Sequence, residues 1–205
     1  MDDQARLYLV TPPLDDAAEF AAVLDPVLAT GAVACVRIRT TDDDESLVRR
    51  IADQLREVAH AHDVAIVLTD HFNLAAATGV DGVHLTDPRL SVREARKVLG
   101  ADAIVGAFAG VSRHDGMTMA EAGADYVSFG PVDQSALGDG SFADGDLFDW
   151  WSEMIETPVV AEGGMTAELS AVLAEKADFI CADKMVWDAP EGPVKAAKTL
   201  AELLK

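Results

Sequence analysis

The sequence has few cysteines, few basic residues and no long apolar run. Its 205 residues include 2 cysteines, Cys35 and Cys181, which lie in the apolar stretches VACVRI and DFICAD, as small buried side chains do. Two isolated cysteines exclude a disulfide framework and indicate a reducing compartment. Residues 1–10 lack a basic start with a following apolar core, and no run approaches about 18 apolar residues. We therefore expect no signal peptide, no membrane span and a cytoplasmic location.

The charge balance is strongly acidic. Asp and Glu total 36 against 16 Lys and Arg, which gives a net charge of -20 and an isoelectric point of about 4.3. Long-range repulsion of polyanions makes nucleic acid a poor partner. The acids are spread along the chain, as in a solubilising surface or in a salt-adapted protein. With 50% hydrophobic and 25% charged residues, the chain has globular composition, and we expect a single domain over residues 1–205.

Short β-rich runs alternate with helical segments from end to end. The apolar spacing of Leu47, Ile51, Leu55 and Val58 is typical of a helix, and the run 91–94 (SVRE) has the form of a capping box. Alternating β and α segments predict a parallel sheet. The eight expected strands are 7–11, 34–39, 64–69, 82–85, 103–108, 125–129, 158–162 and 178–182.

An internal repeat in the sequence indicates which kind of parallel sheet to expect. The segments ATGAVACVRI, ATGVDGVHL and EAGADYVSF each combine a helix end, a glycine and the start of a strand. Their glycines, Gly31, Gly79 and Gly123, recur roughly every 45 residues, as two βα units of a small eightfold barrel would. A doubly wound sheet is the alternative, but no GxGxxG follows the first strand. We predict a single (β/α)8 TIM barrel.

The chemistry of such a barrel is expected at the carboxyl ends of its strands. Arg37 and Arg39 alternate along the second strand and therefore share its inner face. A buried arginine needs either a carboxylate partner or an anionic ligand. Asp70 and Glu162 are the candidate partners, and an anionic substrate is the alternative.

A glycine turn follows the seventh strand and suggests an anion site. Gly163 and Gly164 precede Thr166, which is placed to cap a helix, and backbone N–H groups beside a helix N-terminus bind phosphate in many barrels. Lys184, just past the eighth strand, adds a positive charge there. We expect Lys184 to pair with Glu162, with phosphate contact and Schiff-base chemistry as alternatives.

Two further groups stand at strand ends. His84 suits an acid/base role or, as a lone strand histidine, a hydrogen-bonded core position. Asp70 and Asp87 follow neighbouring strands, and their carboxylates suit a magnesium ion. The irregular stretch 130–146 after the sixth strand is long enough to have a functional role at the mouth of the barrel.

Several segments of the sequence match one known family. The segments TDHFNLAAATGVDGVHL, EAGADYVSFGPV and PVVAEGGMT resemble the thiamine phosphate synthase/TenI family over nearly the whole chain, most specifically at 79–85 and 122–132. The resemblance implies a (β/α)8 barrel that binds phosphorylated small molecules. Synthase members join a pyrimidine diphosphate to a thiazole phosphate with Mg2+, and TenI-type members tautomerise a thiazole carboxylate phosphate.

The family's site residues are only partly present. Its strand-two pattern Gln-x-Arg-x-Lys reads RIRTT at 37–41, which keeps the central Arg39. Of its two magnesium ligands, one matches Asp70 and the other falls on Arg89, with Asp87 close by. Fewer charge-neutralising groups weaken diphosphate chemistry, so we expect ordinary synthase activity to be reduced.

Two hypotheses follow. The first is a divergent enzyme of thiamine metabolism that binds a phosphorylated heterocycle, and the second is a non-catalytic binding or partner protein on the same barrel. The sequence leaves the oligomeric state open, a homodimer included. The residues assigned under the first hypothesis are Arg39, Asp70, His84 and Glu162 for catalysis, Arg37, Gly163, Gly164 and Lys184 for substrate and phosphate, and Asp70 and Asp87 for the metal.

Overall fold

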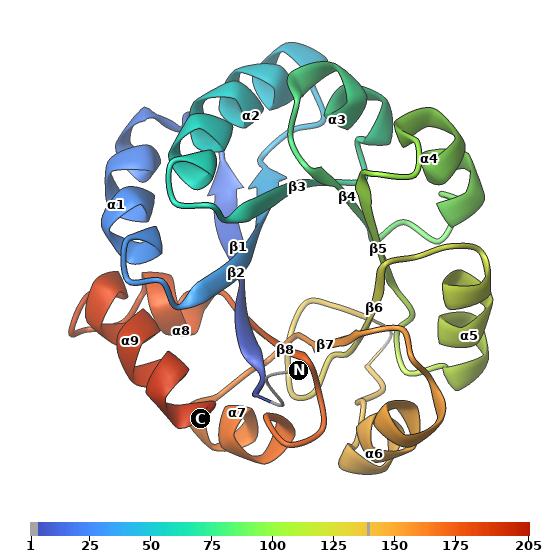
Figure 1. Ribbon diagram of the computed structural model, residues 1–205. Coiled ribbons are helices and arrows are strands. Elements are labelled where there is room, and N and C mark those ends of the chain that lie inside the picture. The colour runs from blue at the N-terminus through green and yellow to red at the C-terminus, as the bar shows by residue number, and fades with distance from the viewer. Residues whose placement is uncertain (1–3, 139) are drawn as a thin grey trace.

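The computed structural model describes residues 4–138 and 140–205, and its strands form a closed parallel barrel in the order β1 to β8 (Figure 1). All eight predicted strands are confirmed. They are β1 (Arg6–Leu14), β2 (Val33–Thr40), β3 (Ala65–Thr69), β4 (Gly82–Leu85), β5 (Ile104–Phe108), β6 (Tyr126–Phe129), β7 (Val159–Ala161) and β8 (Phe179–Ala182).

The helices surround the barrel, and α9 closes their ring between α7 and α1 (Figure 1). The predicted (β/α)8 TIM barrel is therefore confirmed. No helix in the described part of the chain has the length and hydropathy needed to cross a membrane. The helices are α1 (Ala18–Leu28), α2 (Glu45–His60), α3 (Phe72–Thr78), α4 (Val92–Leu99), α5 (Arg113–Glu121), α6 (Gly145–Met154), α7 (Ala167–Leu173), α8 (Lys184–Trp187) and α9 (Pro193–Leu203).

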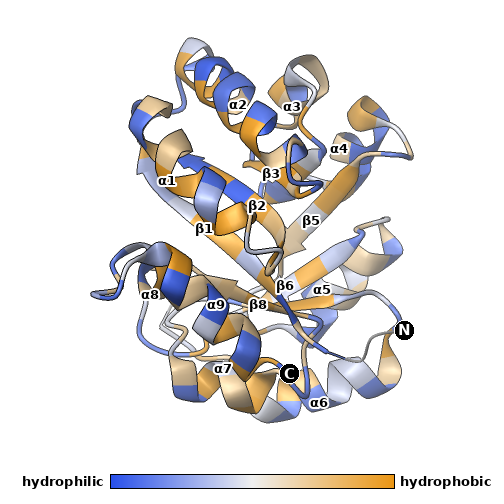
Figure 2. Cartoon of the chain, turned by 60° about the vertical axis from the view of Figure 1, so that its left-hand side comes forward, coloured by the Kyte–Doolittle hydropathy of each residue, from blue (hydrophilic) through white to orange (hydrophobic). Residues whose placement is uncertain are grey.

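Apolar side chains form two layers of core. The strands are mostly hydrophobic, whereas the helices alternate between hydrophobic and hydrophilic residues (Figure 2). The larger layer lies between strands and helices and includes Val36 and Ile38 of β2. The smaller layer fills the barrel interior, where both cysteines are buried as free thiols. Its members are Tyr8, Val10, Cys35, Val67, Tyr126, Val160 and Cys181.

A repeated aspartate ties neighbouring strands together. Asp81, Asp125 and Asp178 directly precede β4, β6 and β8, and each carboxylate accepts a backbone N–H near the start of the preceding strand at 2.7 Å. A charged acceptor makes a stronger hydrogen bond than a neutral one. The same contact therefore joins β3 to β4, β5 to β6 and β7 to β8, once in each of these pairs of βα units.

The predicted helix ends are mostly confirmed. Gly31, Gly79 and Gly123 have φ angles of 70°, 70° and 98°, in the left-handed region that glycine adopts without strain. The capping box at 91–94 is only partly right. Helix α4 begins directly after Ser91, but within the described part of the chain the Ser91 side chain makes no capping hydrogen bond.

Candidate functional site

A buried ion pair crosses the barrel interior from β2 to the end of β7. Arg37 Nη2 lies 2.7 Å from Glu162 Oε2, and their side chains are 5% and 2% exposed. Ser128 donates its hydroxyl to the other carboxylate oxygen at 2.6 Å. The expectation that a carboxylate balances Arg37 is therefore met by Glu162.

The predicted ion pair between Lys184 and Glu162 is wrong. The carboxylate of Glu162 is enclosed and already holds Arg37 and Ser128. Lys184 starts the short helix α8, is exposed, and forms no ion pair with any described residue. Its positive charge is therefore available at the mouth of the barrel.

A chain of buried hydrogen bonds runs from Glu162 to the far end of the interior. Ser128 Oγ lies 3.4 Å from His84 Nε2, His84 Nδ1 lies 2.9 Å from the Tyr126 hydroxyl, and that hydroxyl lies 2.8 Å from the Tyr8 hydroxyl. Ser128 gives its proton to Glu162, so its oxygen accepts from His84 Nε2–H. His84 Nδ1 then accepts from Tyr126. The chain therefore fixes one neutral tautomer of His84.

The charges in this chain follow from burial and from the ion pair. Burial alone would raise the pKa of Glu162, but the guanidinium of Arg37, with His84 and Ser128, outweighs it and lowers that pKa, so the carboxylate is ionised. Burial, and then the charge of Arg37, lower the pKa of His84. His84 is completely buried and neutral, which favours its hydrogen-bonded core role. The catalytic assignments of His84 and Glu162 stay predictions.

Arg39 lies nearer the mouth than Arg37 and is half-buried. Thr11 holds it from both sides, since its carbonyl accepts from Arg39 Nε at 3.1 Å and its hydroxyl accepts from the Arg39 backbone N–H at 3.0 Å. The two Nη groups of Arg39 make no hydrogen bond to a described residue. On Arg37, Nε and Nη1 also have no hydrogen-bond partner among the described residues, but these atoms are enclosed by protein. Arg39 is therefore the interior arginine that a ligand at the mouth can reach.

The glycine turn after β7 packs beneath the loop after β6. Gly163 and Gly164 have φ angles of 82° and 74°, and the Val132 backbone N–H donates to the Gly163 carbonyl at 2.8 Å. A Cβ atom on Gly164 would lie 2.5 Å from the backbone of Asp133, so a larger residue does not fit. The predicted cap at Thr166 is confirmed by its hydrogen bond to the N–H three residues on, at 3.2 Å.

The two predicted metal ligands are neighbours, but both carboxylates already have partners. Asp70 Oδ1 accepts the backbone N–H groups of Thr86 at 2.5 Å and of Asp87 at 3.2 Å, and Oδ2 accepts the Thr86 hydroxyl at 2.6 Å. Arg89 donates Nε to both oxygens of Asp87 at 2.9 and 3.0 Å, and Nη2 to Oδ2 at 2.5 Å. The Arg89 backbone N–H adds a bond at 2.9 Å.

These contacts leave little room for a magnesium ion. Two carboxylates offer about eight acceptor positions, and the hydrogen bonds just described fill most of them. Mg2+ needs several oxygen ligands in octahedral geometry, and the guanidinium of Arg89 would repel it. Among residues 4–138 and 140–205, no group of three or more His, Cys, Asp or Glu side chains is arranged to hold a metal. As placed, Asp70 and Asp87 do not fit the ion.

Comparison with known proteins agrees with this fold. The family described as "Thiamine monophosphate synthase" matches residues 7–186. Thiamine-phosphate synthase of Rhodospirillum centenum is 41% identical over 98% of both chains, and that of Erythrobacter litoralis is 38% identical over 91% of this chain and 90% of the relative. The chain belongs to the thiamine monophosphate synthase family. The structure of thiamine phosphate pyrophosphorylase from Pyrococcus furiosus, 23% identical, superposes with a TM-score of 0.85 over 98% of this chain and 96% of the other.

Membership of the thiamine monophosphate synthase family confirms the predicted resemblance. The residues that differ from the family's pattern can therefore be examined one by one in the structure. Arg37 stands where the resemblance implies glutamine, and Glu162 supplies the charge that this change requires. Sequence reasoning missed Tyr8 and Tyr126, which complete the interior hydrogen bonds. Each tyrosine lies two residues before an inward-facing residue of its strand, Val10 or Ser128, and this shared face was the available signal.

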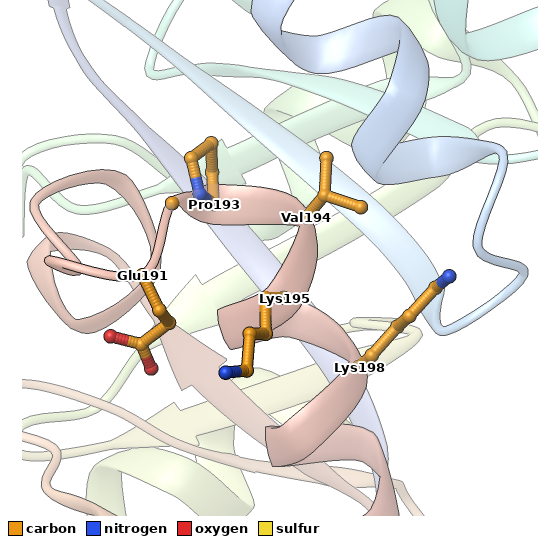
Figure 3. Close-up of a pocket in the computed structure, with 6 residues that line it drawn as sticks. Glu191, Pro193, Val194, Lys195 and Lys198 are labelled. Carbon is orange, nitrogen blue, oxygen red and sulfur yellow. The ribbon is translucent and has the colours of Figure 1, made fainter.

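A separate hollow of about 480 Å³ lies at the start of α9. In Figure 3 the side chains of Lys195 and Lys198 extend from the helix in different directions, beside Glu191 and Pro193. None of the predicted site residues lines this hollow. It is therefore distinct from the barrel mouth.

Proposed function

We propose that the protein binds phosphorylated thiazole and pyrimidine compounds at the barrel mouth and is a transferase of thiamine biosynthesis. The observation that carries this proposal is Arg39, whose backbone and Nε are held by Thr11 while both Nη groups make no bond to described residues. A half-buried, pre-oriented guanidinium is well suited to a phosphate or another anionic group. A chain with a net charge of -20 needs such a local cation to attract an anion.

The proposed binding residues divide between two anionic groups. Gly163, Gly164 and Lys184 hold one phosphate, through backbone N–H groups and an exposed ammonium. Arg39 takes the second group, and Arg37 supports it from below as half of the buried ion pair. In this scheme Arg37 contributes positive charge and packing within the barrel interior, and Arg39 makes the direct contact with the ligand.

The relatives named thiamine-phosphate synthase favour ordinary synthase activity, in which the pyrimidine and thiazole compounds are joined, and the sequence had led us to expect reduced activity. The carboxylates of Asp70 and Asp87 are occupied by hydrogen bonds and do not fit a magnesium ion, which favours the second candidate, a binding protein without catalysis. Both candidates require ligand binding at the mouth, and they differ in turnover. The cytoplasmic location and the homodimer stay predictions.

The test is a thermal-shift titration with thiazole phosphate, pyrimidine phosphate and pyrimidine diphosphate, followed by chromatography of the two-substrate mixture for thiamine phosphate. A ligand bound by the folded state alone raises the melting temperature by an amount set by its Kd. Arg39→Ala and Lys184→Ala should remove the shift, and Arg49→Ala, on the exposed face of α2, should retain it. A shift without product supports the binding protein. No shift with any compound rejects both candidates.

A further inference from the structure

Arg89 and Asp87 form a hydrogen-bonded ion pair on the loop after β4. The guanidinium and the backbone N–H of Arg89 donate to both carboxylate oxygens of Asp87, at 2.5 to 3.0 Å. Asp87 in turn donates its backbone N–H to Asp70 at 3.2 Å. The loop that carries the cation is therefore fixed against the end of β3.

The two members of this pair differ in exposure. The side chain of Arg89 is 87% exposed, and that of Asp87 is 25% exposed. Nη1 of Arg89 makes no hydrogen bond to a described residue. The carboxylate thus holds one edge of the guanidinium, and the opposite side faces solvent at the edge of the mouth. An arginine held in this way loses less side-chain freedom on binding than a free one.

We propose that Arg89 is the resident cation of this part of the mouth and binds a phosphate oxygen of the ligand without a divalent ion. The inference rests on the proposed function for the phosphorylated ligand. Two acidic side chains at the mouth would repel a phosphate, and Arg89 cancels the charge of one of them. The same guanidinium excludes a magnesium ion from Asp87, so metal and arginine are alternative ways of supplying positive charge here.

The test uses inorganic pyrophosphate as the probe and isothermal titration calorimetry as the readout, in EDTA and in excess Mg2+. The wild-type protein should bind pyrophosphate in EDTA. Arg89→Ala should weaken this binding by about tenfold, which is typical of one charge-assisted hydrogen bond. Arg49→Ala removes the same charge from α2, where Arg49 is exposed and without a described partner, and should leave the affinity within about twofold.

A second variant gives a readout that does not depend on any phosphate ligand. Arg89→Asp places a third carboxylate beside Asp70 and Asp87, so this variant should bind Mn2+, detected by electron paramagnetic resonance. The wild-type protein should leave Mn2+ free at the same concentrations. The comparison measures directly whether the arginine keeps a divalent ion out.

Three results would overturn the proposal. They are pyrophosphate binding that requires Mg2+, equal affinities of the wild-type protein and Arg89→Ala in EDTA, and no pyrophosphate binding in either condition. Each leaves the proposed function to be judged by its own titration with thiazole phosphate. If none of the thiazole and pyrimidine compounds raises the melting temperature of the wild-type protein, while Arg89→Ala still weakens pyrophosphate binding, the proposed function alone is rejected.

Discussion

Arg37 Nη2 and Glu162 Oε2 lie 2.7 Å apart inside the barrel, although the two residues are 125 positions apart in the chain. Each charge would be costly to bury alone, because the interior replaces water with apolar side chains. Glu162 also accepts the hydroxyl of Ser128, which satisfies its second oxygen. The pair therefore links β2 to β7 and sets the charge state of the buried interior.

The first prediction concerns the stability of this pair. Arg37→Met or Glu162→Gln leaves a buried group without its partner, and each should lower the free energy of unfolding by about 3–5 kcal/mol. The double variant Arg37→Met/Glu162→Gln should cost less than the sum of the two single changes. Urea unfolding at neutral pH measures all three.

The exposed pair Lys176–Asp149, 25% and 47% exposed, serves as the control. Lys176→Ala should cost much less than either interior change, because solvent screens the charge. Additive effects of the two single interior variants would contradict the coupling.

The second prediction is a loss of stability in acid. Burial lowers the pKa of His84 below its ordinary value of 6.5. The unfolded chain therefore binds a proton that the folded protein does not, and stability falls as the pH drops below about 6.5, by up to about 1.4 kcal/mol per pH unit. The lowered pKa of Glu162 adds a second fall below about 4.5. Urea titrations from pH 8 to pH 4 follow both.

His84→Gln separates the two effects. The amide does not titrate, so the first fall should disappear while the fall below about 4.5 remains. An unchanged slope between pH 6.5 and pH 5 in this variant would assign the acid sensitivity to other groups.

The fold could be predicted because its signals are local. Each strand and helix is specified by apolar spacing over a few residues, and the repeat around Gly31, Gly79 and Gly123 sets the two-unit period. The magnesium prediction considered carboxylates at strand ends without their neighbours. Arg89, two residues past Asp87, was the signal in the sequence that could have indicated a competing cation, but its contacts with both oxygens of Asp87 depend on the loop conformation.

The partners inside the barrel were harder to predict. Glu162 had three candidate cations, Arg37, Arg39 and Lys184. Which one it meets depends on how far each side chain reaches across the interior. Helix α8 begins directly at Lys184 and leaves this side chain exposed at the rim, whereas Arg37 is enclosed. Sequence alternation gives the face of a strand, but not the contact across a barrel.

The third prediction separates a structural role of Asp70 from a metal-binding role. Asp70 has a φ angle of 61° and holds the N–H and hydroxyl of Thr86. Asp70→Ala should lower the free energy of unfolding by about 2–3 kcal/mol through loss of these bonds, even in EDTA. Asp70→Asn, which tolerates a positive φ and keeps an acceptor, should cost less than half as much. A cost that appears only when Mg2+ is present would instead indicate a metal ligand.

The last prediction tests the glycine turn as part of the phosphate site. Gly164→Ala combines strain at a φ angle of 74° with a Cβ only 2.5 Å from the Asp133 backbone, so the turn and the loop above it must separate. Gly31→Ala has a similar φ angle of 70° but no atom of the described residues within 4 Å, and it measures the conformational cost alone, about 1 kcal/mol. Both variants should therefore lose stability, Gly164→Ala the more, and Gly164→Ala alone should lose the thermal shift with thiazole phosphate. If Gly164→Ala retains that shift in full, the backbone N–H groups after β7 do not hold the phosphate, and Arg39 with Lys184 must bind it without them.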